Sequence, residues 1–261
     1  MNREEFIKSL KELGIVATEE QLNNLKIYAD FLLEYNEHTN LTAIKDLDSV
    51  YLKHFYDSLT LIKAIDLSKE IKVIDIGTGA GFPGIPLKIA FPNLKITLLD
   101  SLNKRIKFLD EVIDKLELKD IITIHGRAED FAKDKNYRQS FDLCVSRAVA
   151  NLSTLSEYCL PYVKTGGKFV SYKSEKITDE MNAAKNAIKI LGGNISEQVE
   201  FILPDSDIYR NLFIIDKIKD TPMKYPRKAG LPSKEPLCWG NKYEWRYKKS
   251  VTKYNWTIRR W

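Results

Sequence analysis

The residues whose types and spacing best suit chemistry lie in a glycine-rich segment, residues 73–86. An apolar run that contains Asp75 leads directly into Gly77, Gly79 and Gly81. Glycine tolerates positive φ and lets the backbone approach a ligand closely. The G-x-G-x-G spacing differs from the G-x-G-x-x-G spacing of dinucleotide sites. The segment predicts a buried strand, a ligand-binding turn and a helix, although an ordinary tight strand–helix turn would have a similar sequence.

Two further segments end predicted strands close to this turn. Asp100 closes the next apolar run, where a carboxylate can accept hydrogen bonds from both hydroxyls of a ribose. Residues 125–130 follow the third run, where a backbone N–H or a carboxylate could contact the same ligand. Nicotinamide-dependent enzymes bind a ribose with the same geometry. Asp100 alone therefore does not distinguish a nicotinamide cofactor from another cofactor that contains an adenosyl group. A solvated acid at the end of a strand is the alternative in both places.

The elements that must position these residues follow from the apolar patterns. Residues 1–65 predict helices, beginning with a capping box at Thr18 and Gln21 and including one helix with His54 and Asp57 on the side opposite its apolar face. Short β-branched runs then alternate with helical stretches, which predicts a parallel α/β sheet with crossover helices. The predicted strands are residues 71–76, 95–100, 121–125, 141–146, 168–172, 199–203 and 211–218. The short connection at 204–210 favours a hairpin and an antiparallel last strand.

Charge is distributed unevenly along the chain. The net charge is +5, but residues 238–261 hold seven Lys/Arg, one acid and all four tryptophans. The remainder is close to neutral, so an RNA-binding surface would need local clusters of basic residues. We expect a helical region over 1–65, a catalytic α/β domain over 66–219 and a basic, Pro- and aromatic-containing tail over 220–261. Three cysteines without metal-ligand spacing, no apolar signal core and no long apolar run predict a cytoplasmic protein without a metal or a membrane span.

Four segments together resemble a known family. They are KHFYDS at 53–58, GFPGIP at 81–86, LLDSLNKR at 98–105 and VSRAVA at 145–150. The set, with YPRKAGLPSKEP at 225–236, is similar to the RsmG (GidB) family of 16S rRNA 7-methylguanosine methyltransferases from about residue 15 to about 237. The glycine turn resembles motif I of class I methyltransferases. The resemblance implies a Rossmann-like, S-adenosyl-L-methionine-dependent fold, methylation of a guanine N7 in 16S rRNA, and the 30S subunit as partner.

The resemblance also implies cofactor contacts, and the patterns above add others to them. The expected cofactor-binding residues are Asp75, Gly77, Gly79, Gly81, Phe82, Asp100, Ala128, Glu129 and Arg147. We expect Arg147 to lie between cofactor and guanine as the catalytic positioning residue. The candidate contacts to substrate RNA are His54, Lys104, Arg105, Lys173 and Arg210. A pair between His54 and Asp57 that docks the helix is the alternative role for His54, and a solvated charge is the alternative for each cation.

The residues also bear on the nucleophile. No Asn/Asp-Pro-Pro-aromatic run follows the fourth strand, as amino-group methyltransferases carry, and Cys144 and Cys159 lie within predicted elements as core residues rather than as attacking thiols. A ring nitrogen remains, and guanine N7 needs no general base at neutral pH. One departure from the family is Ser174 after Lys173, where the family often has Gly. The particular nucleotide follows from the resemblance alone.

Three alternatives stay open from the sequence. An NAD-dependent dehydrogenase shares the strand–glycine–helix unit and Asp100, but the glycine spacing and the terminal hairpin argue against it. A non-catalytic RNA-binding protein could retain the same fold. Residues 238–261 are interpreted as an extension without function, because four exposed tryptophans would be costly, although an aromatic–basic RNA tether is the alternative. We expect a monomer that does not bind DNA.

Overall fold

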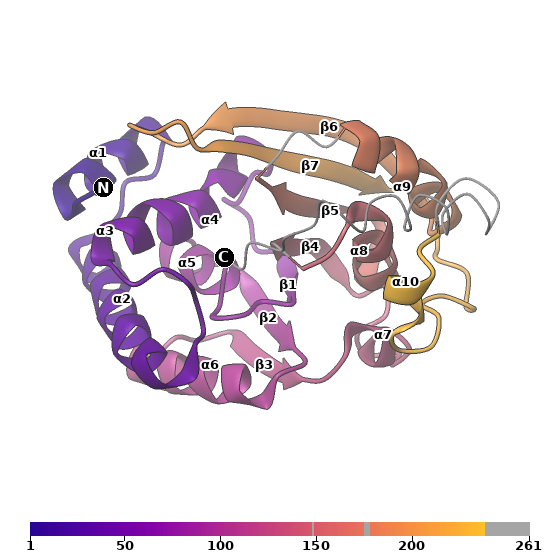
Figure 1. Ribbon diagram of the computed structural model, residues 1–261, viewed down its shortest axis with the longest axis horizontal. Coiled ribbons are helices and arrows are strands. Elements are labelled where there is room, and N and C mark those ends of the chain that lie inside the picture. The colour runs from indigo at the N-terminus through magenta and orange to yellow at the C-terminus, as the bar shows by residue number, and fades with distance from the viewer. Residues whose placement is uncertain (148, 175–177, 238–261) are drawn as a thin grey trace, which may run out of the picture.

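A seven-stranded sheet in the order β3-β2-β1-β4-β5-β7-β6 forms the centre of the molecule (Figure 1). The computed structural model describes residues 1–147, 149–174 and 178–237. The strands are β1 Lys72–Ile76, β2 Lys95–Asp100, β3 Ile121–His125, β4 Phe141–Arg147, β5 Val163–Lys173, β6 Gly193–Ile202 and β7 Tyr209–Lys217. The helices are α1 Arg3–Glu12, α2 Glu19–Thr39, α3 Leu47–Val50, the π-helix η1 Tyr51–Tyr56, α4 Asp57–Leu59, the 3-10 helix η2 Thr60–Lys63, α5 Gly84–Ala90, α6 Asn103–Lys115, α7 Ala128–Phe131, α8 Leu152–Cys159, the 3-10 helix η3 Leu160–Tyr162, α9 Thr178–Ile190 and α10 Leu231–Lys234.

The predicted parallel sheet and terminal hairpin are both confirmed. Strands β1 to β5 pair in parallel, whereas β7 pairs antiparallel with both β5 and β6. The sequence placed β6 at residues 199–203, but the strand begins at Gly193. Its first half carries Ser196, Glu197 and Gln198, because one side of this edge strand faces solvent and needs no apolar run.

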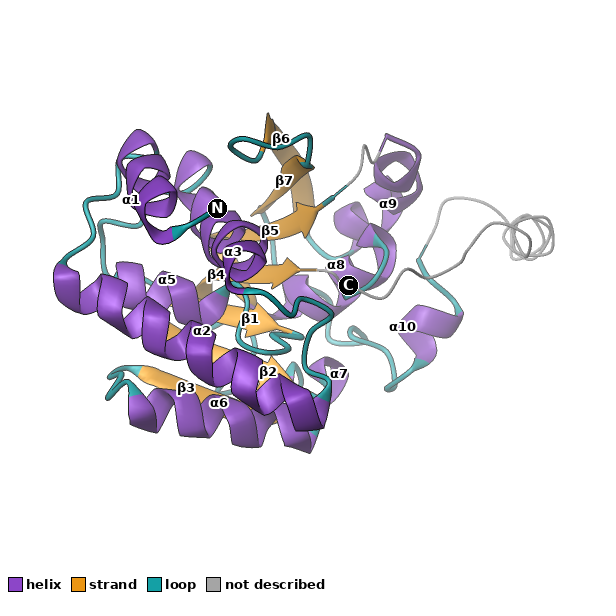
Figure 2. Ribbon diagram, turned by 60° about the vertical axis from the view of Figure 1, so that its left-hand side comes forward, coloured by secondary structure: helices purple, strands orange, loops and turns teal. Residues whose placement is uncertain are grey.

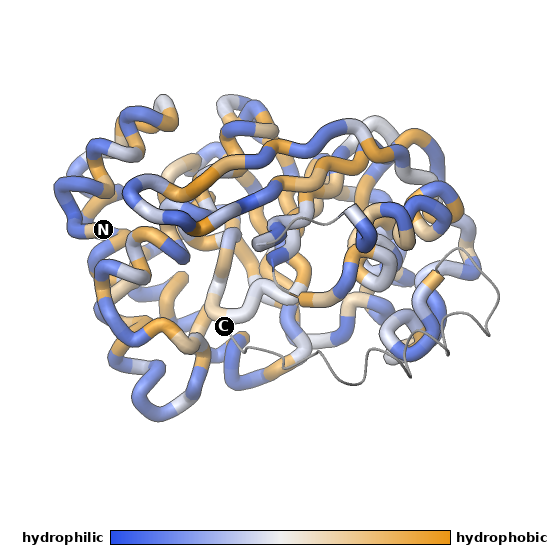
Figure 3. Tube along the Cα trace, turned by 45° about the horizontal axis from the view of Figure 1, so that its top comes forward, coloured by the Kyte–Doolittle hydropathy of each residue, from blue (hydrophilic) through white to orange (hydrophobic). Residues whose placement is uncertain are grey.

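Helices cover both faces of the sheet, and the alternation of side chains along each strand explains how (Figure 2). Val73 of β1 packs in the cluster that contains α1, α2, α5 and α6, while the next residue, Ile74, packs in the cluster that contains α8 and α9. Leu98 and Leu99 of β2 divide in the same way. Hydrophilic and hydrophobic residues alternate along the covering helices (Figure 3), as one-sided burial requires.

The N-terminal helices are fixed to the α/β domain by polar contacts as well as by packing. The predicted capping box at Thr18 and Gln21 is present at the start of α2. The Gln21 amide also donates to the carbonyls of Ile89 (2.9 Å) and Ala90 (3.2 Å) at the end of α5.

The single regular helix expected around His54 is wound instead as η1, α4 and η2. A π-turn of this kind re-aims side chains and is frequent at functional sites.

Residues 220–237 pack against the α/β domain, and apart from α10 they form turns and loops. Arg138 donates to the carbonyls of Thr221 (2.7 Å) and Tyr225 (2.9 Å). Glu157 of α8 is fully buried and accepts from the Arg227 backbone N–H (2.8 Å), Nε (2.9 Å) and Nη2 (2.6 Å).

The four tryptophans and the rest of the 238–261 segment lie outside the described residues. No helix in the described part of the chain is long and apolar enough to cross a membrane.

The Glu157–Arg227 pair should contribute measurably to folding stability. Glu157→Gln removes the buried charge opposite a partly exposed guanidinium, and we expect it to lower the free energy of unfolding by about 2 kcal/mol. Urea unfolding measures the change. Asp30→Asn, which breaks the exposed pair with Lys26, is the matched control and should leave the midpoint unchanged. Equal midpoints for both variants would contradict a stabilising role for this pair.

Candidate functional site

The glycine turn after β1 is shaped as the sequence predicted. Gly77, Gly79 and Gly81 all have positive φ, at 70°, 65° and 97°. The Gly77 and Thr78 N–H groups donate to the Leu99 carbonyl at 2.8 and 3.2 Å, which holds the turn against β2. A Cβ at Gly79 would meet no heavy atom within 4 Å. The backbone at Gly79 is therefore open to a ligand, as the expected cofactor role requires.

Asp75 lies beneath this turn and faces the protein interior. Its Oδ2 accepts from Thr78 Oγ1 (2.7 Å) and from the Gly84 N–H (3.0 Å), so it ties the start of the turn to the start of α5. Its Oδ1 is buried without a hydrogen-bond partner among the described residues. Burial raises the pKa of this carboxyl to about 7, against the opposing hydrogen bond from Thr78. Asp75 shapes the turn from within, and no surface of it is exposed to a ligand.

Asp100 lies at the end of β2 and also organises the turn. Its Oδ2 accepts from the Gly79 N–H (3.0 Å) and from Arg105 Nη1 (3.1 Å), and its Oδ1 accepts from the Leu102 N–H (2.9 Å). The carboxylate is thus fixed between the glycine turn and the start of α6. This placement fits a role in holding a ribose at the carboxyl edge of the sheet.

The third expected cofactor contact lies where β3 leads into α7. Ala128 and Glu129 are the first two residues of α7, so their N–H groups have no intrahelical acceptor. The Glu129 carboxylate is buried, and its Oε1 accepts from the Gly230 N–H at 2.8 Å. The C-terminal segment therefore closes over this edge. The sequence did not predict that contact, because Glu129 and Gly230 are far apart along the chain.

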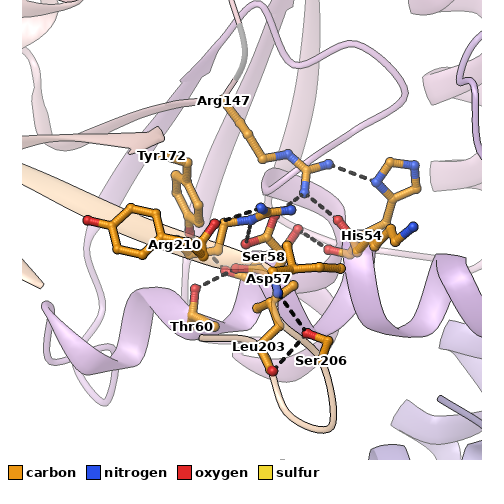
Figure 4. Close-up of polar contacts among 12 residues, drawn as sticks. His54, Asp57, Ser58, Thr60, Arg147, Tyr172, Leu203, Ser206 and Arg210 are labelled. Atoms are coloured by element: carbon orange, nitrogen blue, oxygen red, sulfur yellow. Dashed lines mark hydrogen bonds and ion pairs between the residues drawn. The ribbon is translucent and has the colours of Figure 1, made fainter. Parts of the chain in front are cut away.

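Arg147, the last residue of β4, forms the most connected polar group of the site (Figure 4). Its Nη1 donates to Asp57 Oδ2 (3.0 Å) and to the Lys53 carbonyl (3.1 Å), and its Nη2 contacts His54 Nδ1 at 3.0 Å. The guanidinium also lies 5.0 Å from the centroid of the Phe82 ring. Asp57 binds Arg210 Nε at 2.9 Å through its other oxygen. The expected His54–Asp57 pair is not formed, since both residues bind Arg147 instead.

His54 stacks on Phe82, with ring centroids 4.2 Å apart and an interplanar angle of 16°. Its Nε2 contacts Thr42 Oγ1 at 2.9 Å. A guanidinium only donates, so His54 Nδ1 must accept and Nε2 must carry the proton. Burial, together with the nearby charge of Arg147, holds the pKa of His54 well below its ordinary value. His54 is accordingly a neutral side chain that connects Arg147 to Thr42 in the loop of residues 40–46, which joins α2 to α3.

The structure places the other candidate RNA contacts in different surroundings. Arg210 is buried against Asp57, and Lys173 is paired with Glu180 (2.6 Å), so both have structural partners. Arg105 is paired with Asp100, while Lys104 is exposed and donates to the Thr39 carbonyl (2.7 Å). Lys104 is therefore the expected RNA contact with the freest side chain among these five.

The described residues fit an adenosyl cofactor at this edge. The open backbone at Gly79, the fixed Asp100 carboxylate and the uncapped start of α7 lie at the ends of the neighbouring strands β1, β2 and β3. Sequence reasoning missed Thr42 and the dual pairing of Asp57. The KHFYDS segment and the helical spacing of His54 and Asp57 pointed to Asp57, whereas no apolar period marks the loop that carries Thr42.

The lowered pKa of His54 predicts a pH-dependent contribution to stability. The unfolded chain protonates His54 near pH 6.5, whereas the folded chain stays neutral to a lower pH. The folded state therefore loses stability as the pH falls below about 6.5, by about 1.4 kcal/mol per pH unit for this one proton. Urea unfolding of wild type and His54→Asn between pH 7.5 and 5 would measure it, over a range set by the ordinary histidine pKa of about 6.5. We expect a shallower loss in the variant, and identical slopes would contradict the burial of a neutral His54.

Comparison with known proteins agrees with this arrangement. The family described as GidB, rRNA small subunit methyltransferase G, matches residues 21–208. The ribosomal RNA small subunit methyltransferase G of Lachnoclostridium phytofermentans is 53% identical over 232 residues, which cover 89% of this chain and 96% of the relative. The protein of the same name from Alkaliphilus oremlandii is 54% identical over 225 residues, which cover 86% of this chain and 94% of the relative.

Solved structures share the fold at much lower identity. A putative O-methyltransferase from Klebsiella pneumoniae has a TM-score of 0.50 and 12% identity, covering 74% of this chain and 90% of its own. A chain from the complex of a Haloferax volcanii methyltransferase activator with a putative methyltransferase has a TM-score of 0.51 and 13% identity, covering 65% of this chain and 92% of its own. The chain has a class I, Rossmann-like methyltransferase fold, and, by the family match and by relatives more than half identical to it, it belongs to the rRNA small subunit methyltransferase G family.

Proposed function

We propose that this protein transfers a methyl group from S-adenosyl-L-methionine to N7 of a guanine in 16S rRNA, with the 30S subunit as its partner and the bacterial cytoplasm as its location. The observation that carries the proposal is the convergence of the glycine turn, Asp100 and Arg147 at the carboxyl ends of β1, β2 and β4. In open α/β sheets, ligands bind at this edge. The names of the relatives supply the class of substrate.

The side chains at this edge suit a ring-nitrogen nucleophile. When bound, the cofactor supplies an electrophilic methyl group on a sulfonium. Cys144 and Cys159 are fully buried in the hydrophobic cluster that contains α8 and α9, on the face of the sheet away from the N-terminal helices. Neither thiol can therefore attack a base carbon. A guanine N7 carries its lone pair at neutral pH and needs no general base. The task of the protein is then to align the two reactants, which supplies much of the rate of such displacements.

Arg147 is the residue best placed for that alignment. Three of its N–H groups donate to Lys53, His54 and Asp57. Its Nε–H and one Nη2–H have no acceptor among the described residues. Contacts that fix the guanidinium in advance cost no reorganisation at the moment of reaction. Asp57 offsets part of its charge, so the group binds a polar acceptor without repelling the sulfonium strongly.

Methyl transfer to ribosomal subunits tests the proposed reaction. Purified protein and labelled S-adenosyl-L-methionine are incubated with 30S subunits that lack small-subunit 7-methylguanosine, and the labelled nucleoside is identified. We expect 7-methylguanosine in 16S rRNA. Naked 16S rRNA and 50S subunits serve as the comparison substrates. Binding of adenosylhomocysteine without any transfer would overturn the reaction and favour a non-catalytic RNA-binding protein.

Substitution of Arg147 tests the alignment role. Arg147→Lys keeps the charge but cannot bind His54 and Asp57 together, so we expect kcat/KM for 30S subunits to fall by about 100-fold. Arg3→Lys, at an exposed residue that is paired with Glu19, is the matched control and should retain full activity. Unfolding curves show whether each variant remains folded. Unchanged turnover of a folded Arg147→Lys protein would rule out this role.

A further inference from the structure

Beyond Arg147, a chain of hydrogen bonds runs outward to a residue with no role assigned so far. Arg147 Nη2 lies 3.0 Å from His54 Nδ1, and His54 Nε2 lies 2.9 Å from Thr42 Oγ1. Thr42 belongs to the 40–46 loop between α2 and α3. These hydrogen bonds therefore connect the end of β4 to a loop for which the sequence predicted no function.

The donors along this chain have a fixed direction. Arg147 can only donate, so His54 accepts at Nδ1 and donates from Nε2 to Thr42. Thr42 Oγ1 also accepts from the Ile44 N–H at 3.2 Å. Both lone pairs of the Thr42 hydroxyl are then in use, and its own proton must point away from both neighbours. Among the described residues, that proton has no acceptor.

Thr42 is held in place more firmly than most loop residues. The side chain of Asn36, itself buried, accepts from the Thr42 N–H (2.9 Å) and donates to the Thr42 carbonyl (2.9 Å). The preceding residue, Leu41, is buried in the core. A hydroxyl whose backbone and acceptor side are both fixed is a pre-oriented donor, and such donors cost little entropy when they bind a ligand.

The loop lies at the carboxyl edge of the sheet. Lys104, in the first turn of α6, donates to the Thr39 carbonyl immediately before the loop (2.7 Å), and α6 follows directly after Asp100. In Figure 2 the segment between α2 and α3 lies on the side of the molecule toward which β1 and β2 point. Thr42 is partly exposed there.

We propose that Thr42 is a substrate-binding residue, whose hydroxyl donates to a carbonyl oxygen of the methyl-accepting base, with His54 and Asn36 as its positioning residues. This inference rests on the proposed function. For a guanine that reacts at N7, the neighbouring O6 is an acceptor of the required kind, and a hydrogen bond there would hold the ring without engaging the nucleophile. His54 and Phe82, which stack on each other, lie between Thr42 and the glycine turn.

The carboxylate of the cofactor is the other oxygen that Thr42 could meet, but the charges favour the base. A carboxylate is best matched by a cation, and Arg147, with unpaired N–H groups, already provides one nearer the glycine turn. Thr42 is neutral, lies one ring further out and is partly exposed. These properties match a neutral acceptor that arrives with a large substrate from outside.

Three variants at position 42 test the proposal. Thr42→Val keeps the shape and removes the hydroxyl, Thr42→Ala removes both, and Thr42→Ser keeps the donor. We expect kcat/KM for 30S methylation to fall by about tenfold or more in Val and Ala. Ser should stay near wild type, and the Kd of adenosylhomocysteine, measured by calorimetry, should be nearly unchanged in all three. Thr39→Val, which removes a hydroxyl bonded to the Tyr35 carbonyl within α2, is the matched control and should be fully active.

Each other outcome has a definite meaning. Full activity of a folded Thr42→Val protein would overturn the proposal, since the hydroxyl would then donate only to water. A weaker Kd for adenosylhomocysteine in Val, restored in Ser, would assign Thr42 to the cofactor or to the support of Arg147, and would overturn it as well. If wild type transfers no methyl group to 30S subunits, the proposed function itself fails, independently of position 42.

Discussion

The buried carboxylate of Asp57 is the constraint on which the rest of the site depends. One oxygen binds Arg147 from β4 and the other binds Arg210 from β7, with the Asp57 side chain only 3% exposed. An anion between two guanidinium groups offsets part of the cost of burying both charges in the protein interior. This triad joins the N-terminal helices to two strands of the sheet, and it aims Arg147 toward the glycine turn. The π-winding of η1, which continues directly into α4, places Lys53 and His54 of η1 and Asp57 of α4 around that one guanidinium.

The carboxyl edge of the sheet, where the cofactor binds, is organised mainly by the buried carboxyl groups of Asp75 and Asp100. Asp75 accepts from the Thr78 hydroxyl and the Gly84 N–H, and Asp100 accepts from the Gly79 and Leu102 N–H groups, so the shape of the turn is determined before a ligand arrives. Pre-organised sites of this kind lose little binding energy to ordering. The role of Asp75 is therefore one of support, while the open backbone at Gly79 is the surface available to a ligand.

The C-terminal segment completes the other side of the same edge. Gly230 donates to Glu129 of α7, Arg227 binds the buried Glu157 of α8, and Arg138 binds the carbonyls of Thr221 and Tyr225. Residues 220–237 are therefore attached to the α/β domain by these hydrogen bonds and by the Arg227–Glu157 ion pair. The polar and proline-rich composition of this segment concealed its packing, because its contacts are made by ion pairs and backbone groups and not by an apolar stripe.

The sequence by itself determined the order of strands and helices, the glycine turn, and the acids at the ends of β1 and β2. These features depend on local periodicity and on the conformations that glycine permits. Even the family resemblance identified Arg147 without its partners. Only the tertiary structure decided that Arg147 and Arg210 share Asp57, that His54 is a neutral link to Thr42, and that Gly230 covers Glu129. Such contacts join residues far apart in the chain, and their geometry depends on how helices pack on a twisted sheet, which no local pattern of side chains encodes.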